Sequence, residues 1–187
     1  MEAFLSSSVA VAIAEIGDKT QLLSLFLAAR FPQRSAIISG IFIATLINHG
    51  ASAWLGLWLT SLIPVGWERW LIGGSFILVA LWLLIPDKDE GATSSLDRYG
   101  AFIATVVLFF LAEIGDKTQI ATVILAAQYE SVFWVMMGTT FGMLLANVPV
   151  VLAGNWIMQK LPLNMMRWVA CALFAALGVA TIVIRNP

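Results

Sequence analysis

Charged side chains are scarce in this sequence of 187 residues. Asp, Glu, Lys and Arg together make up 11% of the chain, whereas hydrophobic residues make up 60%. A soluble domain is about a quarter charged and about half apolar. The mean hydropathy of +0.93 is correspondingly high. The composition therefore predicts an integral membrane protein and leaves little of the chain for a soluble domain.

Cysteine occurs once, as Cys171, and histidine occurs once, as His49. A lone cysteine excludes an internal disulfide and a cluster of thiolate metal ligands. The formal net charge is −1 and there is no basic tail, which argues against nucleic acid as a partner. The sequence also lacks G-x-x-x-x-G-K-[ST], so a P-loop nucleotide site is excluded.

Six apolar segments are long enough to cross a bilayer, which takes roughly 20 residues. No basic stretch precedes the first segment, unlike in a secretory signal peptide, so we expect this segment to remain as a membrane span. Short loops such as "RFPQRS" and "QKLPLN" separate the segments. The expected helices cover residues 3–29, 36–62, 69–86, 100–127, 132–158 and 165–184.

The second half of the chain repeats the first at a constant offset of 98 residues. The octapeptide "AEIGDKTQ" occupies residues 14–21 and again residues 112–119. Further identities follow without a gap, such as Gly40 with Gly138 and Gly56 with Gly154. We expect a first three-helix repeat over residues 1–86, a linker over 87–98 and a second three-helix repeat over 99–187. The spacing of "GTTFG", residues 138–142, predicts close helix packing.

Three spans per repeat is an odd number, so the second repeat should enter the membrane from the opposite side. We therefore predict an all-α membrane protein whose six transmembrane helices form two inverted-topology three-helix repeats, as in many secondary transporters. Basic residues in short loops mark the cytoplasmic side. Their distribution favours a cytoplasmic central loop and both termini outside. One side carries Arg30, Arg34, Lys88, Arg98, Lys160 and Arg167, and the other carries Arg69 and Arg185.

Each octapeptide places two acids and a lysine near the middle of an apolar span. On a helix these three residues share one face, and Gly17 and Gly115 permit a local break. An ionised group at this depth costs at least about 2.5–3.5 kcal/mol, so we expect both faces to line one cavity near the midplane. The charged residues are Glu15, Asp18 and Lys19 in the first copy and Glu113, Asp116 and Lys117 in the second.

Four acids and two lysines leave two negative charges in this cavity. A purely structural network, for example one built on a Glu15–Lys19 pair, would tend toward neutrality, because an unpaired buried charge is heavily penalised. The excess matches one divalent cation or two protons. We therefore interpret the acids as metal ligands and the lysines as charge balance. The expected ligands are Glu15, Asp18, Glu113 and Asp116, with Lys19 and Lys117 balancing their charge.

Weaker candidates for lining the site are the oxygen-bearing side chains that follow each motif lysine. Sites made only of oxygen suit Mg²⁺, Ca²⁺ and Mn²⁺, and the motifs contain no cysteine or histidine to favour zinc or copper. These candidates are Thr20, Gln21, Thr118 and Gln119.

His49 lies in the middle of the second expected span, beside Asn48, and the equivalent residue in the second half is Asn147. His49 is either a packed, hydrogen-bonded residue or an ionisable group lining the cavity. Because the repeat is not conserved here between the halves, we interpret His49, Asn48 and Asn147 as possible modulators rather than core ligands.

Both copies of "EIGDKT" fit the pattern Glu, any residue, Gly, Asp, Lys or Arg, then Thr or Ser. In this the chain resembles, over nearly its whole length, the Gdt-type cation/proton exchangers of the Golgi, chloroplasts and bacteria. The resemblance implies exchange of Mn²⁺ and/or Ca²⁺ for protons, with the motif acids as the binding site. It implies no cofactor, because the ion is the substrate. The short linker is similar to that of a bacterial member in the plasma (inner) membrane.

Two other functions are compatible with parts of the sequence. A small amino-acid exporter of a related superfamily also has three-helix repeats, but the double acid site argues against it. An intramembrane aspartyl protease needs two aspartates that share a proton, which Asp18 and Asp116 could supply. Glu15 and Lys19 have no counterpart in its signature. We therefore expect a transporter and not an enzyme.

Overall fold

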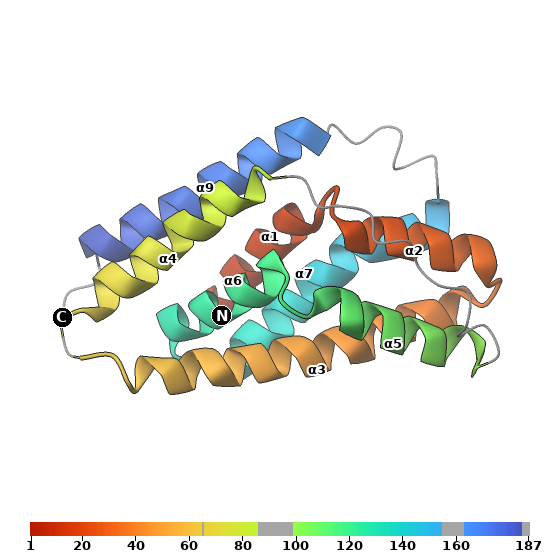
Figure 1. The fold of residues 1–187 in the computed structure, drawn as a ribbon, viewed down its shortest axis with the longest axis horizontal. Coiled ribbons are helices and arrows are strands. Elements are labelled where there is room, and N and C mark those ends of the chain that lie inside the picture. Colours follow the sequence, from red (N-terminus) through yellow and green to blue (C-terminus); the bar gives the residue numbers. More distant parts are fainter. Residues whose placement is uncertain (65, 86–98, 155–162, 185–187) are drawn as a thin grey trace.

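The computed structural model describes residues 1–64, 66–85, 99–154 and 163–184. The residues in these ranges form helices joined by short turns, with no strand among them (Figure 1). This confirms the all-helical class. The helices are α1 (Glu2–Glu15), α2 (Lys19–Arg30), α3 (Arg34–Thr60), α4 (Glu68–Leu83), α5 (Gly100–Glu113), α6 (Lys117–Tyr129), α7 (Val132–Ala153) and α9 (Leu163–Ile184).

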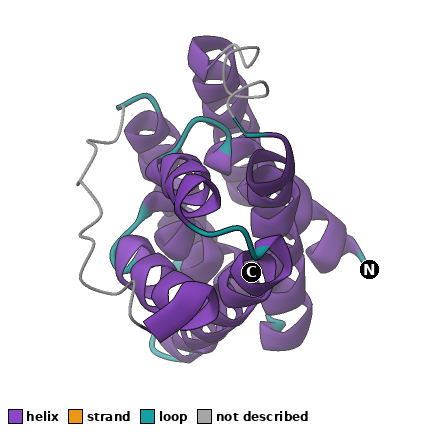
Figure 2. Ribbon diagram, turned by 90° about the vertical axis from the view of Figure 1, so that its right-hand side faces the viewer, coloured by secondary structure: helices purple, strands orange, loops and turns teal. Residues whose placement is uncertain are grey.

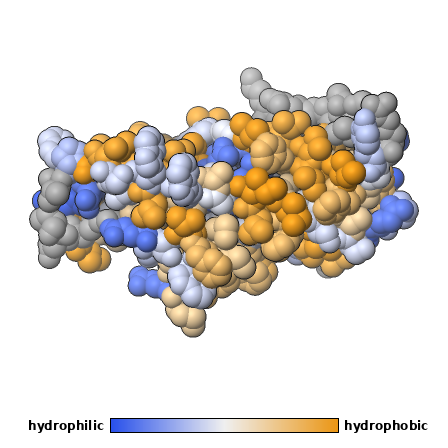
Figure 3. Space-filling view, turned by 90° about the horizontal axis from the view of Figure 1, so that it is seen from below, coloured by the Kyte–Doolittle hydropathy of each residue, from blue (hydrophilic) through white to orange (hydrophobic). Residues whose placement is uncertain are grey.

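The outer surface is that of a membrane protein. Helices α3 and α7 and residues 164–184 of α9 are each long and apolar enough to cross a bilayer. Large apolar side chains such as Trp54 and Leu78 are 62% and 69% exposed. Figure 3 shows apolar side chains over much of the middle of one face, with hydrophilic ones mostly toward its two ends. The expected linker over 87–98 and the end of the span expected over 132–158 lie outside the described residues.

The two spans that carry the octapeptides are not continuous helices, contrary to the sequence-based expectation. The span expected over 3–29 is divided into α1 and α2, and the span expected over 100–127 into α5 and α6. Gly17 and Gly115 have φ angles of +85° and +74°. A right-handed helix cannot continue through such a residue, and glycine adopts this conformation without steric cost. The prediction that the charged residues of each motif share one face of a continuous helix was therefore wrong, because the helix is interrupted within the motif.

Equivalent small residues bring the halves together. A Cβ atom added to Gly40 on α3 would lie 2.7 Å from Cβ of Thr105 on α5. A Cβ atom added to Gly138 on α7 would lie 3.0 Å from Cβ of Ser7 on α1. Thr105 and Ser7 are themselves 98 positions apart. The α3–α5 and α7–α1 contacts are therefore equivalent under the sequence repeat, and the predicted packing role of Gly138 is confirmed.

The remaining helices complete a bundle around the two broken segments. Helices α4 and α9 run side by side along one flank of the molecule and touch α6 and α1 respectively (Figure 1). Figure 2 shows many of the helices nearly end on. Both breaks lie near the middle of the long axis in Figure 1. The acids of both octapeptides are buried there, whereas Ile114 and Gly115 of the second copy are exposed.

Candidate cation site

The two breaks are built in the same way, with a glutamine side chain closing each one. Gln21 Oε1 accepts a hydrogen bond from the Gly17 amide at 2.9 Å, and Gln119 Oε1 accepts one from the Gly115 amide at 2.6 Å. Amides near a helix end have no partner within the helix, so a side-chain acceptor is needed there. This stabilising role was missed from the sequence. The signal for it is a glutamine four residues after the glycine in both copies.

Three motif acids meet in the interior, and they come from both copies. Glu15 ends α1, Glu113 ends α5, and Asp116 precedes α6 as its N-cap. All three are buried, and one carboxylate oxygen from each lies within 4.8 Å of the others. Asp18, the N-cap of α2, is also buried but is not a member of this group. The structure therefore brings together acids of both octapeptides, three of the four that were expected to converge.

A threonine bonds each of the two glutamates. Thr20 Oγ1 donates to Glu15 Oε2, and Thr118 Oγ1 donates to Glu113 Oε2 at 3.5 Å. Each pair lies within a single octapeptide and spans its break. Both threonines are buried, so their hydroxyl groups lie at the site.

Each of the three clustered carboxylates also carries one buried oxygen with no hydrogen-bond partner among the described residues. Burial of an unsatisfied polar atom is costly, and three in one place require an explanation. A cluster of three neighbouring carboxylates can bind a metal ion or protons. The three oxygens are Oε1 of Glu15, Oε1 of Glu113 and Oδ2 of Asp116.

The two motif lysines have different surroundings. Lys19 Nζ lies 3.6 Å from Asp116 Oδ1, so it reaches across to the other copy. Its side chain is 28% exposed, whereas that of Asp116 is 2% exposed. Lys117 Nζ instead donates to the backbone oxygen of Ile85 at 2.6 Å, beyond the end of α4. Lys19 therefore contributes a positive charge at the edge of the acid cluster.

His49 and Asn48 place α3 against the second broken span. His49 is fully buried, and its Nε2 lies 3.5 Å from Glu113 Oε2. Asn48 Nδ2 donates to the backbone oxygen of Phe110 on α5 at 3.1 Å. Of these two residues, His49 contacts the acid cluster directly and Asn48 contacts the helix that carries it.

Asn147, the residue equivalent to His49, places α7 against the first broken span. Its Oδ1 accepts from Ser24 Oγ on α2 at 2.8 Å, and its Nδ2 donates to the backbone oxygen of Met143 at 3.1 Å. Gln21 Nε2 reaches the same helix by donating to the backbone oxygen of Ala146 at 3.0 Å. The two halves thus differ at this position, with an imidazole near a carboxylate in one and a fully bonded amide in the other.

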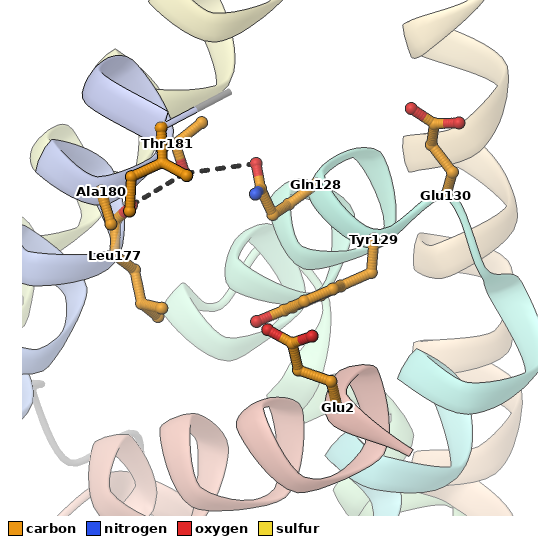
Figure 4. A pocket seen from close by; sticks show the side chains of 8 residues that line it. Glu2, Gln128, Tyr129, Glu130, Leu177, Ala180 and Thr181 are labelled. Carbon is orange, nitrogen blue, oxygen red and sulfur yellow. Dashed lines mark hydrogen bonds between the residues drawn. The ribbon is translucent and has the colours of Figure 1, made fainter. Parts of the chain in front are cut away.

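A cavity of about 360 Å³ lies apart from the acid cluster, where the start of α1 meets the ends of α6 and α9 (Figure 4). Thr181 Oγ1 donates to Gln128 Oε1 at 3.2 Å on its wall. No octapeptide residue lines it, so it is separate from the expected site. Its lining residues are Glu2, Gln128, Tyr129, Glu130, Leu177, Ala180, Thr181 and Ile184.

Comparison with known proteins identifies relatives along nearly the whole chain. A protein named "Putative manganese exporter" from Vibrio cholerae is 52% identical over 176 residues, which is 94% of this chain and 88% of that protein. A "GDT1-like protein" of Synechocystis is 24% identical over 205 residues, which is 97% of each chain. Another, "GDT1-like protein 4" of Arabidopsis thaliana, is 24% identical over 219 residues, covering 96% of this chain and 94% of the relative. No solved structure matches.

The family model described as "Divalent cation/proton antiporter GDT1" matches residues 3–91 and 101–186. Both octapeptides lie within the matched ranges. The family consists of transporters, so the chain is not an enzyme, and the ion is a substrate rather than a cofactor. The resemblance drawn from the motifs is confirmed, and the chain belongs to the GDT1 divalent cation/proton antiporter family.

Proposed function

We propose that this protein exchanges a divalent cation, Mn²⁺ and/or Ca²⁺, for protons at a site near the membrane midplane built from both octapeptides. The observation that carries the proposal is the meeting of Glu15, Glu113 and Asp116, each with one buried oxygen that has no hydrogen-bond partner among the described residues. Carboxylate oxygens are the preferred ligands of these hard cations.

The local charge supports a divalent ion. The three clustered carboxylates carry three negative charges when ionised, and Lys19 beside Asp116 contributes one positive charge. Two negative charges remain, which one divalent cation or two protons neutralise. The same remainder results when all four motif acids and both lysines are counted. A neutral site can pass through the low-dielectric interior, whereas a doubly negative one meets a large desolvation penalty.

Asp18 belongs to the proposed ligand set through the repeat. It is the equivalent of Asp116, and like Asp116 it is a buried N-cap residue next to a glycine break. In inverted repeats, rocking of one repeat against the other exchanges the environments of equivalent residues. We infer that Asp18 replaces Asp116 in the cluster when the site opens to the other side. In that state Lys117 would lie beside Asp18, as Lys19 now lies beside Asp116.

The topology is part of the same proposal. We infer two inverted three-helix repeats, a cytoplasmic central loop, both termini outside, and a location in a bacterial plasma membrane. The name of the Vibrio cholerae relative supports Mn²⁺ as an ion and export as the direction.

Transport by purified protein in proteoliposomes tests this function. Uptake of Mn²⁺, Ca²⁺ and Mg²⁺ is measured one ion at a time under an imposed pH gradient. We expect uptake of Mn²⁺ or Ca²⁺ that collapses when the pH gradient is removed. Glu15→Gln should abolish it, whereas Glu2→Gln, at the exposed start of the same helix, should not. Uptake that ignores the pH gradient, or that survives Glu15→Gln, would contradict the proposal.

A further inference from the structure

We propose that His49 is a ligand of the transported cation, and that its nitrogen makes the site favour Mn²⁺ over Ca²⁺ and Mg²⁺. The inference rests on the proposed function and adds one donor to the ligand set, from a helix outside the octapeptides. All other candidate donors at the site are oxygens.

The imidazole of His49 lies beside one carboxylate of the acid cluster. His49 Nε2 lies 3.5 Å from Glu113 Oε2, and both side chains are fully buried. Two donors that each lie about 2.2 Å from one ion are roughly 3 to 4 Å apart when the angle between them is about 90–130°. The observed separation falls in this interval. One ion can therefore contact Nε2 and this Glu113 oxygen. His49 is not a member of the group of Glu15, Glu113 and Asp116 whose donor atoms lie within 4.8 Å of one another, so binding by all four side chains requires them to close around the ion.

Hydrogen bonds among the described residues do not explain why the imidazole is buried. Neither Nδ1 nor Nε2 of His49 has a hydrogen-bond partner there, although the ring is completely buried. A neutral imidazole has one nitrogen that donates and one that accepts, and buried polar groups of this kind are normally satisfied. The site therefore contains a nitrogen without a hydrogen-bond partner among the described residues, Nε2 of His49, in addition to the carboxylate oxygens.

The repeat supplies an internal comparison. Asn147, at the equivalent position of α7, has its amide oxygen bonded to Ser24 and its amide nitrogen bonded to Met143. That residue ties helices together and has no such orphaned atoms. Asparagine is therefore sufficient at this position when the residue only holds helices together. The presence of an imidazole at the equivalent position of α3 requires another explanation.

Metal chemistry supplies that reason. Ca²⁺ and Mg²⁺ are hard ions bound almost entirely by oxygen. Imidazole nitrogen is a ligand of first-row transition ions, and Mn²⁺ belongs to that series while also accepting carboxylates and water. A site with three carboxylates and one imidazole therefore retains Mn²⁺ and discriminates against Ca²⁺ and Mg²⁺.

Pulsed electron paramagnetic resonance of Mn²⁺ bound to the purified protein tests the contact directly. The chain has one histidine, so labelling with ¹⁵N-histidine changes only His49 when the purification tag contains no histidine. We expect echo modulation from a coordinated ¹⁴N nucleus that is replaced by a ¹⁵N signal on labelling. Bound Mn²⁺ with no nitrogen modulation would overturn the inference and leave the proposed function standing. Failure of the wild-type protein to bind Mn²⁺ would contradict both.

Competition measures the consequence for selectivity. In proteoliposomes, His49→Asn, which copies the residue of the second half, should lower by about tenfold the Ca²⁺ concentration that halves Mn²⁺ uptake, the effect of losing one modest ligand interaction. Ser52→Ala is the control, because Ser52 is a buried α3 residue whose hydroxyl donates to the backbone oxygen of Asn48 in its own helix. Unchanged competition in His49→Asn would contradict the inference, and equal loss in both variants would assign the effect to packing.

Discussion

Lys19 of the first octapeptide lies 3.6 Å from Asp116 of the second, so a lysine of one half neutralises a carboxylate of the other. This contact lies at the edge of the acid cluster, to which both sequence copies contribute carboxylates. It joins the start of α2 to the start of α6, the two helices that follow the glycine breaks. The pair links the charge of the site to the relative position of the two halves.

A substitution that removes the positive charge of Lys19 should impair transport more than one that keeps the charge and changes the shape of the side chain. Lys19→Met leaves the cluster with three negative charges, which one divalent cation no longer neutralises. Lys19→Arg keeps the charge and should retain substantial activity. Initial rates of Mn²⁺ or Ca²⁺ uptake in proteoliposomes measure the difference. Equal rates in the two variants would show that the lysine does not act through its charge.

Conversion of any motif acid to its amide should reduce transport at least tenfold, because each change removes a ligand charge with little change in volume. The variants are Glu15→Gln, Asp18→Asn, Glu113→Gln and Asp116→Asn. Glu130→Gln, on the wall of the separate cavity, is the matched control and should transport normally. Sensitivity of the two halves should be similar. Near-normal uptake by Asp18→Asn would exclude the proposed exchange of Asp18 for Asp116.

Gly115→Ala should destabilise the protein through its backbone alone. A Cβ atom at this position would meet nothing within 4 Å, but φ is +74°, a conformation that costs an L-residue about 1–2 kcal/mol. We expect a lower unfolding temperature and reduced transport. Gly74→Ala is the control, since its Cβ also meets nothing within 4 Å and it lies inside α4. That change should keep or raise stability by about 0.5–1 kcal/mol. Equal effects of the two changes would contradict the strain argument.

Exchange should be electroneutral, with two protons moving against each divalent cation. The prediction follows from the two negative charges that remain at the site. Cation flux in proteoliposomes should then depend on the pH gradient but not on a potential imposed with potassium and valinomycin. A flux that rises with potential at a fixed pH gradient would show that net charge moves, and that the assumed charge of the site is wrong.

Much of this protein was determined by its sequence. The scarcity of charge made it a membrane protein, because lipid accepts few ionised groups. The offset of 98 residues established the duplication, and the contacts of Gly40 and Gly138 are equivalent under it. Acids and lysines repeated at identical spacing inside apolar segments identified the family and the expected ligands. These features were readable because they depend on residue type and period alone.

Other features were decided only by tertiary structure. The glycines permitted a break in each span, but the extended residues beside them and the glutamine side chains that close the breaks depend on local geometry. The break sets Glu15 at the end of one helix and Asp18 at the start of the next. Helical spacing therefore could not predict which acids meet.

The partners of the charged groups depended on the packing of segments far apart in the chain. Lys19 has Glu15 at the helical spacing of a local pair, yet the structure places its ammonium beside Asp116. His49 was recognisable as an ionisable residue in a span, but its distance from Glu113 follows from how α3 packs on α5. The sequence determined which groups must be buried together, and the fold determined which atoms face each other, because contacts between helices have no period along the chain.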